Sequence, residues 1–137
     1  MSHLDAPENV AAAFAKLPEN VQPILWDIRQ LIFEVADTLD NVSPLIETLK
    51  WGEPAYLPKV SGIGTTIRLG CSRHYPNKAC MFFNCRTQLV DDFRNQFPDE
   101  FYYEGNRGVI LKQNQCEPKG AIEFCISAAL TYHQRKR

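Results

Sequence analysis

The sequence predicts a single α+β domain, a central antiparallel sheet with N- and C-terminal helices packed against it. The chain has 137 residues, which is the length of one domain. Apolar residues recur at helical spacing near both ends of the chain. Between the ends lie short segments that alternate between apolar and polar residues, or are apolar throughout, and are separated by glycine and proline as strands are.

Two helices are expected at the start of the chain. The first begins at a cap by Asp5, runs to about Lys16 and is stopped by the next proline. The second begins at a cap by Asn20 and continues to Leu39, and Pro23 is tolerated because it falls in the first turn.

The second helix has the most regular pattern in the chain. Its apolar stripe consists of Ile24, Ile28, Leu31, Ile32, Val35 and Leu39. Its polar face consists of Asp27, Arg29, Gln30, Glu34 and Asp37. This division predicts an amphipathic helix that lies on a sheet or on another helix.

The middle of the chain is predicted to hold strands, a short helix and a hairpin. Pro44–Thr48 is expected to form one helical turn. Alternation predicts a strand at Thr65–Ser72, and continuous apolar character predicts a strand covered on both sides at Ala79–Cys85. The remaining elements are a helix over Gln88–Phe97, a hairpin of Phe101–Glu104 and Val109–Leu111 around a two-residue Gly105-Asn106 turn, and a last helix opened by Pro118.

One short segment concentrates aromatic and charged residues, the stretch Glu-Thr-Leu-Lys-Trp-Gly-Glu-Pro-Ala-Tyr-Leu at 47–57. Its glycine and proline interrupt any helix, and the proline pushes the glutamate before it into an extended conformation. We therefore expect a bent, extended segment that fixes the directions of Lys50, Trp51, Glu53 and Tyr56. Trp51 is expected to be largely buried, because it can remove a large apolar area from water.

Four stretches carry a resemblance to a known family: 47–57, Thr-Thr-Ile-Arg-Leu-Gly at 65–70, Met-Phe-Phe-Asn-Cys-Arg-Thr at 81–87 and Phe-Tyr-Tyr-Glu-Gly-Asn-Arg-Gly at 101–108. They resemble the YdhG-like family, a bacterial family built on a domain of unknown function, and the resemblance extends from about Val10 to His133. It implies an α+β fold with a central antiparallel sheet. One branch of that family resembles frataxin in shape and is linked to intracellular iron delivery.

The predicted ligand-binding residues are Lys50, Trp51, Glu53, Tyr56, Arg68, Glu104 and Arg107. Guanidinium groups hold carboxylate or phosphate through paired hydrogen bonds, so these residues predict a cleft for a small anionic ligand. Three cations brought together repel one another, which a folded protein tolerates where an anion binds. The structural alternative places Trp51 and Tyr56 in the core, pairs Glu104 with Arg107 and leaves Lys50 solvated.

Other clusters give weaker indications of metal chemistry. Hard cations prefer oxygen ligands, and the acidic set consists of Asp91, Asp92, Asp99, Glu100 and Glu104. This set lacks histidine and fixed spacing, and Cys71 with His74 is a single pair where structural zinc needs two. No phosphate loop, dinucleotide fingerprint, nucleophile elbow or zinc-protease motif is present, so no metal and no cofactor are expected.

Composition bounds the partners and the compartment. The formal net charge is −1, from 15 basic and 16 acidic residues, so neither nucleic acid nor a membrane surface is an expected partner. The five cysteines, Cys71, Cys80, Cys85, Cys116 and Cys125, are odd in number and lack paired spacing, which argues against a disulfide framework. The first residues do not form a signal peptide and no apolar stretch could span a bilayer. We therefore expect a cytoplasmic monomer or homodimer.

The leading hypothesis is a small-ligand or partner-binding domain of the YdhG-like family, with an anion pocket around the Trp-Gly-Glu-Pro motif and no identified catalytic residue. Two alternatives remain open, a frataxin-like iron-binding chaperone and an acid-base enzyme of unknown substrate that uses Glu53 with Lys50. A binding domain requires a concave pocket that contains Lys50 and Arg68. A chaperone requires carboxylates clustered on one exposed surface, and an enzyme requires a carboxylate with a strongly shifted pKa in a cleft.

Overall fold

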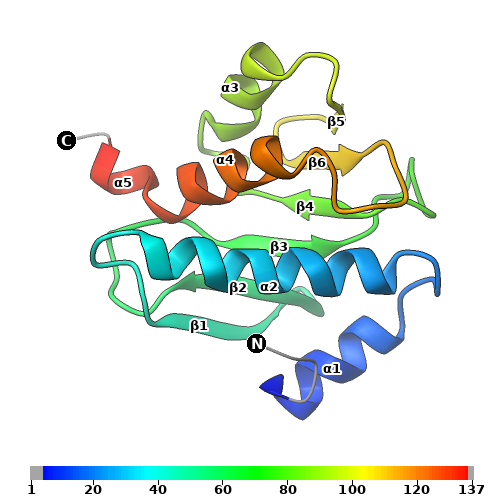
Figure 1. Cartoon of the computed structure of the whole chain (residues 1–137), viewed down its shortest axis with the longest axis horizontal. Helices are drawn as coiled ribbons and strands as arrows, with labels where there is room; N and C mark the ends of the chain where they lie inside the picture. The colour runs from blue at the N-terminus through cyan, green and yellow to red at the C-terminus, as the bar shows by residue number, and fades with distance from the viewer. Residues whose placement is uncertain (1–4, 136–137) are drawn as a thin grey trace.

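The computed structural model describes residues 5–135 and confirms the α+β class, with a six-stranded antiparallel sheet and helices packed against it (Figure 1). The strands are β1 (Leu45–Lys50), β2 (Glu53–Pro58), β3 (Ile67–Gly70), β4 (Cys80–Phe82), β5 (Phe101–Glu104) and β6 (Gly108–Leu111). The helices are α1 (Glu8–Ala15), α2 (Gln22–Thr38), α3 (Leu89–Gln96), α4 (Lys119–Leu130) and α5 (Tyr132–Arg135).

The sheet has the strand order β1-β2-β3-β4-β6-β5, and every pair of neighbours is antiparallel. The first four strands follow one another in the chain, whereas β6 pairs with β4 on one side and with β5 on the other. In Figure 1 the long helices α2 and α4 run side by side in front of the strands. Strands far apart in the sequence are thereby joined under one helical layer.

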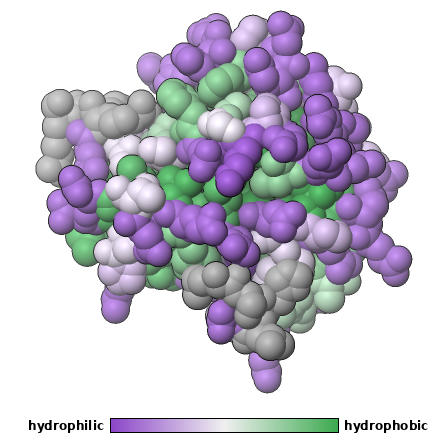
Figure 2. Space-filling model, in the orientation of Figure 1, coloured by the Kyte–Doolittle hydropathy of each residue, from purple (hydrophilic) through white to green (hydrophobic). Residues whose placement is uncertain are grey.

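The main core lies between these helices and one face of the sheet. Ile28 and Ile32 of α2 and Ile126 of α4 are fully buried together with Ile67 and Met81 of the sheet. On the helical side of the molecule, hydrophilic residues dominate the surface, and hydrophobic residues show in the band between α2 and α4 (Figure 2). The apolar stripes predicted from the sequence therefore do face the sheet and each other.

The other face of the sheet, which we call the open face, has a small core of its own. Cys80, Phe82 and Ile110 are buried there, with Tyr75 packed against them. Within residues 5–135 no helix contributes to this cluster. Alternation along the strands puts Lys50, Glu53, Arg68 and Glu104 on the same face as Phe82. Long charged side chains can shield apolar atoms with their stems, so they can replace a helical cover.

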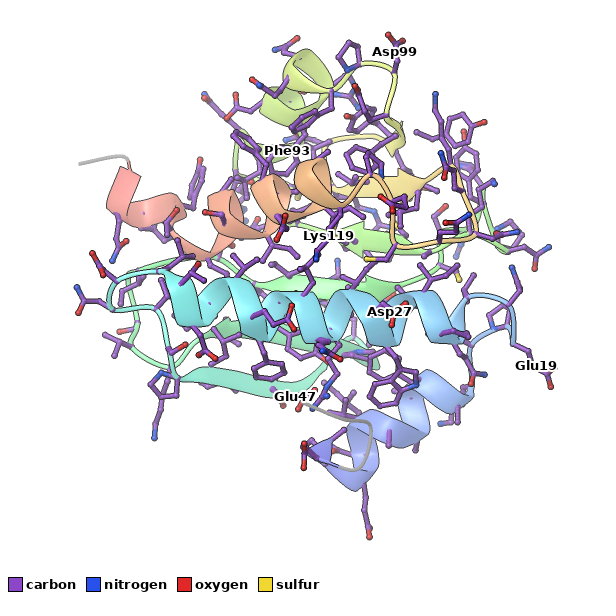
Figure 3. All side chains as sticks on the ribbon, in the orientation of Figure 1. Glu19, Asp27, Glu47, Phe93, Asp99 and Lys119 are labelled. Atoms are coloured by element: carbon purple, nitrogen blue, oxygen red, sulfur yellow. The ribbon has the colours of Figure 1, made fainter. Side chains whose placement is uncertain are left out.

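One predicted surface residue lies in the interior. Arg29 was expected on the polar face of its helix, but it is only 1% exposed. Its Nε lies 2.6 Å from Oε2 of Glu47, and its Nη2 donates to Oε1 of the same carboxylate at 2.9 Å. Glu47 belongs to β1 and lies beneath α2 in Figure 3. Helical periodicity could not predict this placement, because the partner that neutralises the guanidinium comes from a strand.

Local details of four elements differ from the sequence prediction. Pro44–Thr48 is not a helical turn, because Leu45–Lys50 pairs with β2 along its whole length. Neither of the first two helices has the predicted side-chain cap, since Pro7 and Val21 occupy the N-cap positions. The last hairpin has a three-residue loop, because Glu104 pairs with Gly108 and leaves residues 105–107 outside the ladder.

The structure also bears on the state of the cysteines and on membrane-spanning helices. All five cysteines are free thiols, two of them buried. Among the described residues, no helix has the length and apolar character needed to cross a bilayer.

Candidate functional site

The tip of the β1–β2 hairpin is a two-residue turn made by Trp51 and Gly52 between the paired residues Lys50 and Glu53. Both central residues have positive φ, 56° for Trp51 and 76° for Gly52, which is the pattern of a type I′ turn. Trp51 is 90% exposed, so the prediction that it is buried is wrong. The reason is that residues inside a hairpin turn lie beyond the last cross-strand pair and cannot contribute to the ladder or to the core under it.

A depression of about 410 Å³ lies beside this turn. The residues that line it are Lys50, Trp51, Thr65, Thr66, Arg68, Phe83, Asn84, Cys85 and Arg107. Four of the seven predicted ligand-binding residues are thus brought together at one surface, although they come from three separate stretches of the chain. They are the three cations and the exposed tryptophan of the predicted set.

The two arginines share an aromatic support. The guanidinium carbon of Arg68 lies 5.1 Å from the centre of the Phe82 ring, and that of Arg107 lies at the same distance. Each arginine also has one carboxylate partner: Arg68 forms an ion pair with Glu53, and Nη2 of Arg107 lies 3.4 Å from Oε2 of Glu104. A guanidinium carries five N–H donors, so each arginine keeps donors for a further acceptor.

Glu53 is held in a half-buried position next to Arg68. Gly70 makes this possible, because a Cβ on that residue would lie 2.6 Å from Oε2 of Glu53. Burial raises the pKa of Glu53, and the nearby charges of Arg68 and Arg107 oppose that rise. Glu53 therefore orients Arg68 from the side, and it is not among the residues that line the depression.

Lys50 approaches the depression from the edge strand. Its Nζ donates to Oγ1 of Thr66 at 3.3 Å, so the side chain reaches across β2 to the segment that leads into β3. The proposed acid-base pair of Lys50 with Glu53 is not formed in the structure, since each of them is bonded to another residue.

Two predicted residues have other places. Tyr56 is fully buried in the main core, where its hydroxyl donates to Oε2 of Glu47 at 2.7 Å. It belongs to the ion pair under α2, because alternation along β2 turns it to the opposite face from Glu53. Glu104 lies behind Arg107, and its Oε1 is 3.4 Å from Nδ1 of His74.

Phe82, which supports both arginines of the candidate site, is a residue that sequence reasoning missed. It lies inside an apolar run, and in the sequence an aromatic residue that supports arginine side chains looks the same as an ordinary core residue. The signal that would have found it is its cross-strand pairing with Arg68, which requires the register of β3 against β4.

The acidic set is dispersed over the surface. Asp91 pairs with Arg94 at 2.9 Å on α3, and Glu104 lies beside Arg107. Asp99, labelled in Figure 3, lines a separate depression together with Glu100 and Lys112. Within residues 5–135 there is no group of three or more histidine, cysteine, aspartate or glutamate side chains that could hold a metal ion.

Comparison with protein-family models, with curated proteins and with solved structures finds no match for this chain. The resemblance to the YdhG-like family therefore stays a prediction from the four sequence stretches that carry it.

The hairpin turn leads to a first prediction. Trp51→Asn should leave the free energy of unfolding unchanged or raise it by up to about 1 kcal/mol, because asparagine adopts positive φ more readily than a bulky residue and no burial is lost. Urea denaturation measures this free energy. Gly52→Ala is the control, with an expected loss of about 1–2 kcal/mol from the same backbone conformation. A loss above about 1 kcal/mol for Trp51→Asn would mean that the indole is packed after all.

Proposed function

We propose that this chain is a small-ligand-binding domain and that the depression beside the β1–β2 turn binds a small anion. The observation that carries the proposal is that Lys50, Arg68 and Arg107 line one depression, while the described residues lining it include no carboxylate. Like charges gathered on one surface raise its positive potential and attract an anion.

The two carboxylates nearby do not remove this attraction. Glu53 and Glu104 each contact one arginine from outside the lining of the depression. They offset two of the three positive charges, which makes the cluster tolerable in the free protein. Among residues 5–135, Lys50 donates to a hydroxyl, Oγ1 of Thr66, and no carboxylate of that range forms an ion pair with it.

The arginines are also held in place before any ligand arrives. Each guanidinium stands over the Phe82 ring and is tied to a carboxylate, which restricts the rotamers of two long side chains. Side chains that are already ordered lose less entropy when they bind, and planar guanidinium groups suit carboxylate or phosphate oxygens. These features support recognition of a phosphate or carboxylate group rather than of a neutral one.

The test is the effect of Arg107→Ala on binding. Inorganic phosphate and succinate should raise the thermal unfolding midpoint of the wild-type chain, because a ligand of the folded state stabilises it. Arg107→Ala should change the midpoint of the free protein little, since an exposed ion pair contributes roughly 0.2–1 kcal/mol. The variant should weaken anion binding by roughly tenfold or more, because a hydrogen bond to a charged group contributes about 1.5–3 kcal/mol.

Lys112→Ala is the matched control for that experiment. Lys112 is also a cation above an aromatic ring, with Nζ 5.0 Å from the centre of Tyr102, but it lines a different depression. The Lys112→Ala variant should bind both anions as tightly as the wild type does. If Arg107→Ala and Lys112→Ala weakened anion binding equally, only the overall charge of the protein would matter, and the proposal would be wrong.

The remaining parts of the proposal rest on the sequence. Membership of the YdhG-like family is supported by the four motif stretches, and a cytoplasmic location is supported by the free thiols, which persist where disulfides are kept reduced. The dispersed carboxylates and the separate bonding of Lys50 and Glu53 supply no specific support for an iron chaperone or an acid-base enzyme.

A further inference from the structure

Trp51 occupies a position that the fold alone does not explain. A type I′ turn favours asparagine or glycine at its first central position, and a bulky side chain there is strained by the positive φ of 56°. The indole is 90% exposed and belongs to neither hydrophobic cluster. Neither turn chemistry nor packing therefore accounts for a tryptophan at this residue.

The surroundings of Trp51 indicate what the indole can contact. It lines the same depression as Lys50, Arg68 and Arg107. A tryptophan face is a strong stacking surface for a planar ring, and stacking accepts any nucleobase because every base has such a face. The depression therefore places a stacking surface next to three groups that bind phosphate.

We propose that the ligand of this depression is a nucleoside phosphate, whose base stacks on Trp51 while its phosphate is held by Arg68, Arg107 and Lys50. The proposal rests on the anion site described above and adds a ring to the ligand. A volume of about 410 Å³ falls in the range of roughly 300–1,000 Å³ that small-molecule sites occupy. An exposed indole at the rim lets the base lie against the outside of the depression.

Three probes separate the two halves of such a ligand: AMP, ribose 5-phosphate and adenosine. The chain has two tryptophans. The second, Trp26, is stacked on Phe14 with 3.9 Å between the ring centres, and it does not line the depression. In a Trp26→Phe background the fluorescence therefore reports Trp51 alone. AMP should quench this emission at saturation, and ribose 5-phosphate should bind more weakly without quenching it. Adenosine should bind far more weakly than AMP.

Variants then assign the contacts by calorimetric titration. Trp51→Asn should weaken AMP binding at least about fivefold, the lower end of what stacking contributes, and leave ribose 5-phosphate binding unchanged. Arg107→Ala should weaken the binding of both AMP and ribose 5-phosphate. Tyr102→Ala is the matched control: Tyr102 is another exposed aromatic residue beside a cation, but it does not line the depression, and its loss should leave AMP binding unchanged.

The outcomes distinguish this inference from the anion site. Equal binding of AMP and ribose 5-phosphate, or an equal loss of both in Trp51→Asn, would overturn the stacking role and leave the anion site standing. Binding of adenosine as tight as that of AMP, or no binding of either phosphate compound, would overturn both proposals.

Discussion

Replacing Glu47 by alanine should lower the free energy of unfolding by about 3–5 kcal/mol, the loss expected when one partner of a buried ion pair is removed. Arg29 is 1% exposed, and Glu47 accepts two hydrogen bonds from it and one from the Tyr56 hydroxyl. The guanidinium also lies between aromatic residues, 5.5 Å from the ring centre of Trp26 and 5.1 Å from that of Phe33. Without the carboxylate, a positive charge stays in surroundings that offer it little solvation.

Urea denaturation checks this value, and Asp91→Ala is the matched control. Asp91 is also the acidic partner of an arginine, but its pair with Arg94 lies on the surface of α3. Its loss should change the free energy by less than about 1 kcal/mol. Adding Arg29→Met to Glu47→Ala should restore much of the loss, because an apolar side chain needs no partner. A change below about 1 kcal/mol for Glu47→Ala would show that Arg29 finds other solvation.

Gly64→Ala should destabilise the chain by about 3 kcal/mol, at the upper end of what an overpacked methyl group causes. A Cβ at this position would lie 2.2 Å from the carbonyl oxygen of Leu130. Neither side can retreat easily, because the amide of Thr65 donates to Ala129 at 2.9 Å and the amide of His133 donates to Ile63 at 3.0 Å. The loop before β3 is thus fastened to the end of α4.

Gly120→Ala tests the same substitution where space is free. Gly120 lies in the first turn of α4, and nothing is within 4 Å of its added Cβ. Alanine there should raise the free energy of unfolding by up to about 1 kcal/mol through helix propensity. Changes of opposite sign in the free energy of unfolding for Gly64→Ala and Gly120→Ala, measured by thermal or urea unfolding, would confirm the packing argument. Equal small changes would contradict it for Gly64.

Because Thr65 and Thr66 line the depression, Gly64→Ala should also weaken anion binding.

The elements that the sequence predicted well are those decided by local pattern. The apolar stripe of α2 and the helix after Pro118 lie where periodicity placed them. The apolar run Ala79–Cys85 does contain a buried strand, although β4 covers only Cys80–Phe82 of it. The failures depend on partners distant in the chain. Pro44–Thr48 was predicted to be helical because local sequence does not reveal its pairing with β2, which is a tertiary contact. Arg29 was predicted to be solvated because its partner, Glu47, comes from a strand distant in the sequence.

The site was predictable in its charges and not in its geometry. The chemistry of Lys50, Arg68 and Arg107 suggested an anion cluster, and the structure brings these three residues to one depression. Tyr56 was predicted to bind the ligand but lies in the main core, as the structural alternative had it, because the strand period could be applied only once the start of β2 was known. Trp51 was assigned to the core because its size favours burial, whereas the turn places it outside.

The pair of Glu47 with Arg29 also bears on how the edge of the sheet resists misassembly. β1 is the terminal strand in the order of the sheet, so its outer backbone groups could template the addition of a foreign strand. A slip of β1 by one residue would turn Glu47 outward and bring Ile46 or Thr48 opposite Arg29, and neither can neutralise it. Stacking of β1 segments from several molecules would likewise crowd Glu47 carboxylates that have no guanidinium between them. One buried charge pair thus disfavours strand slippage and amyloid-like polymerisation at this edge of the sheet.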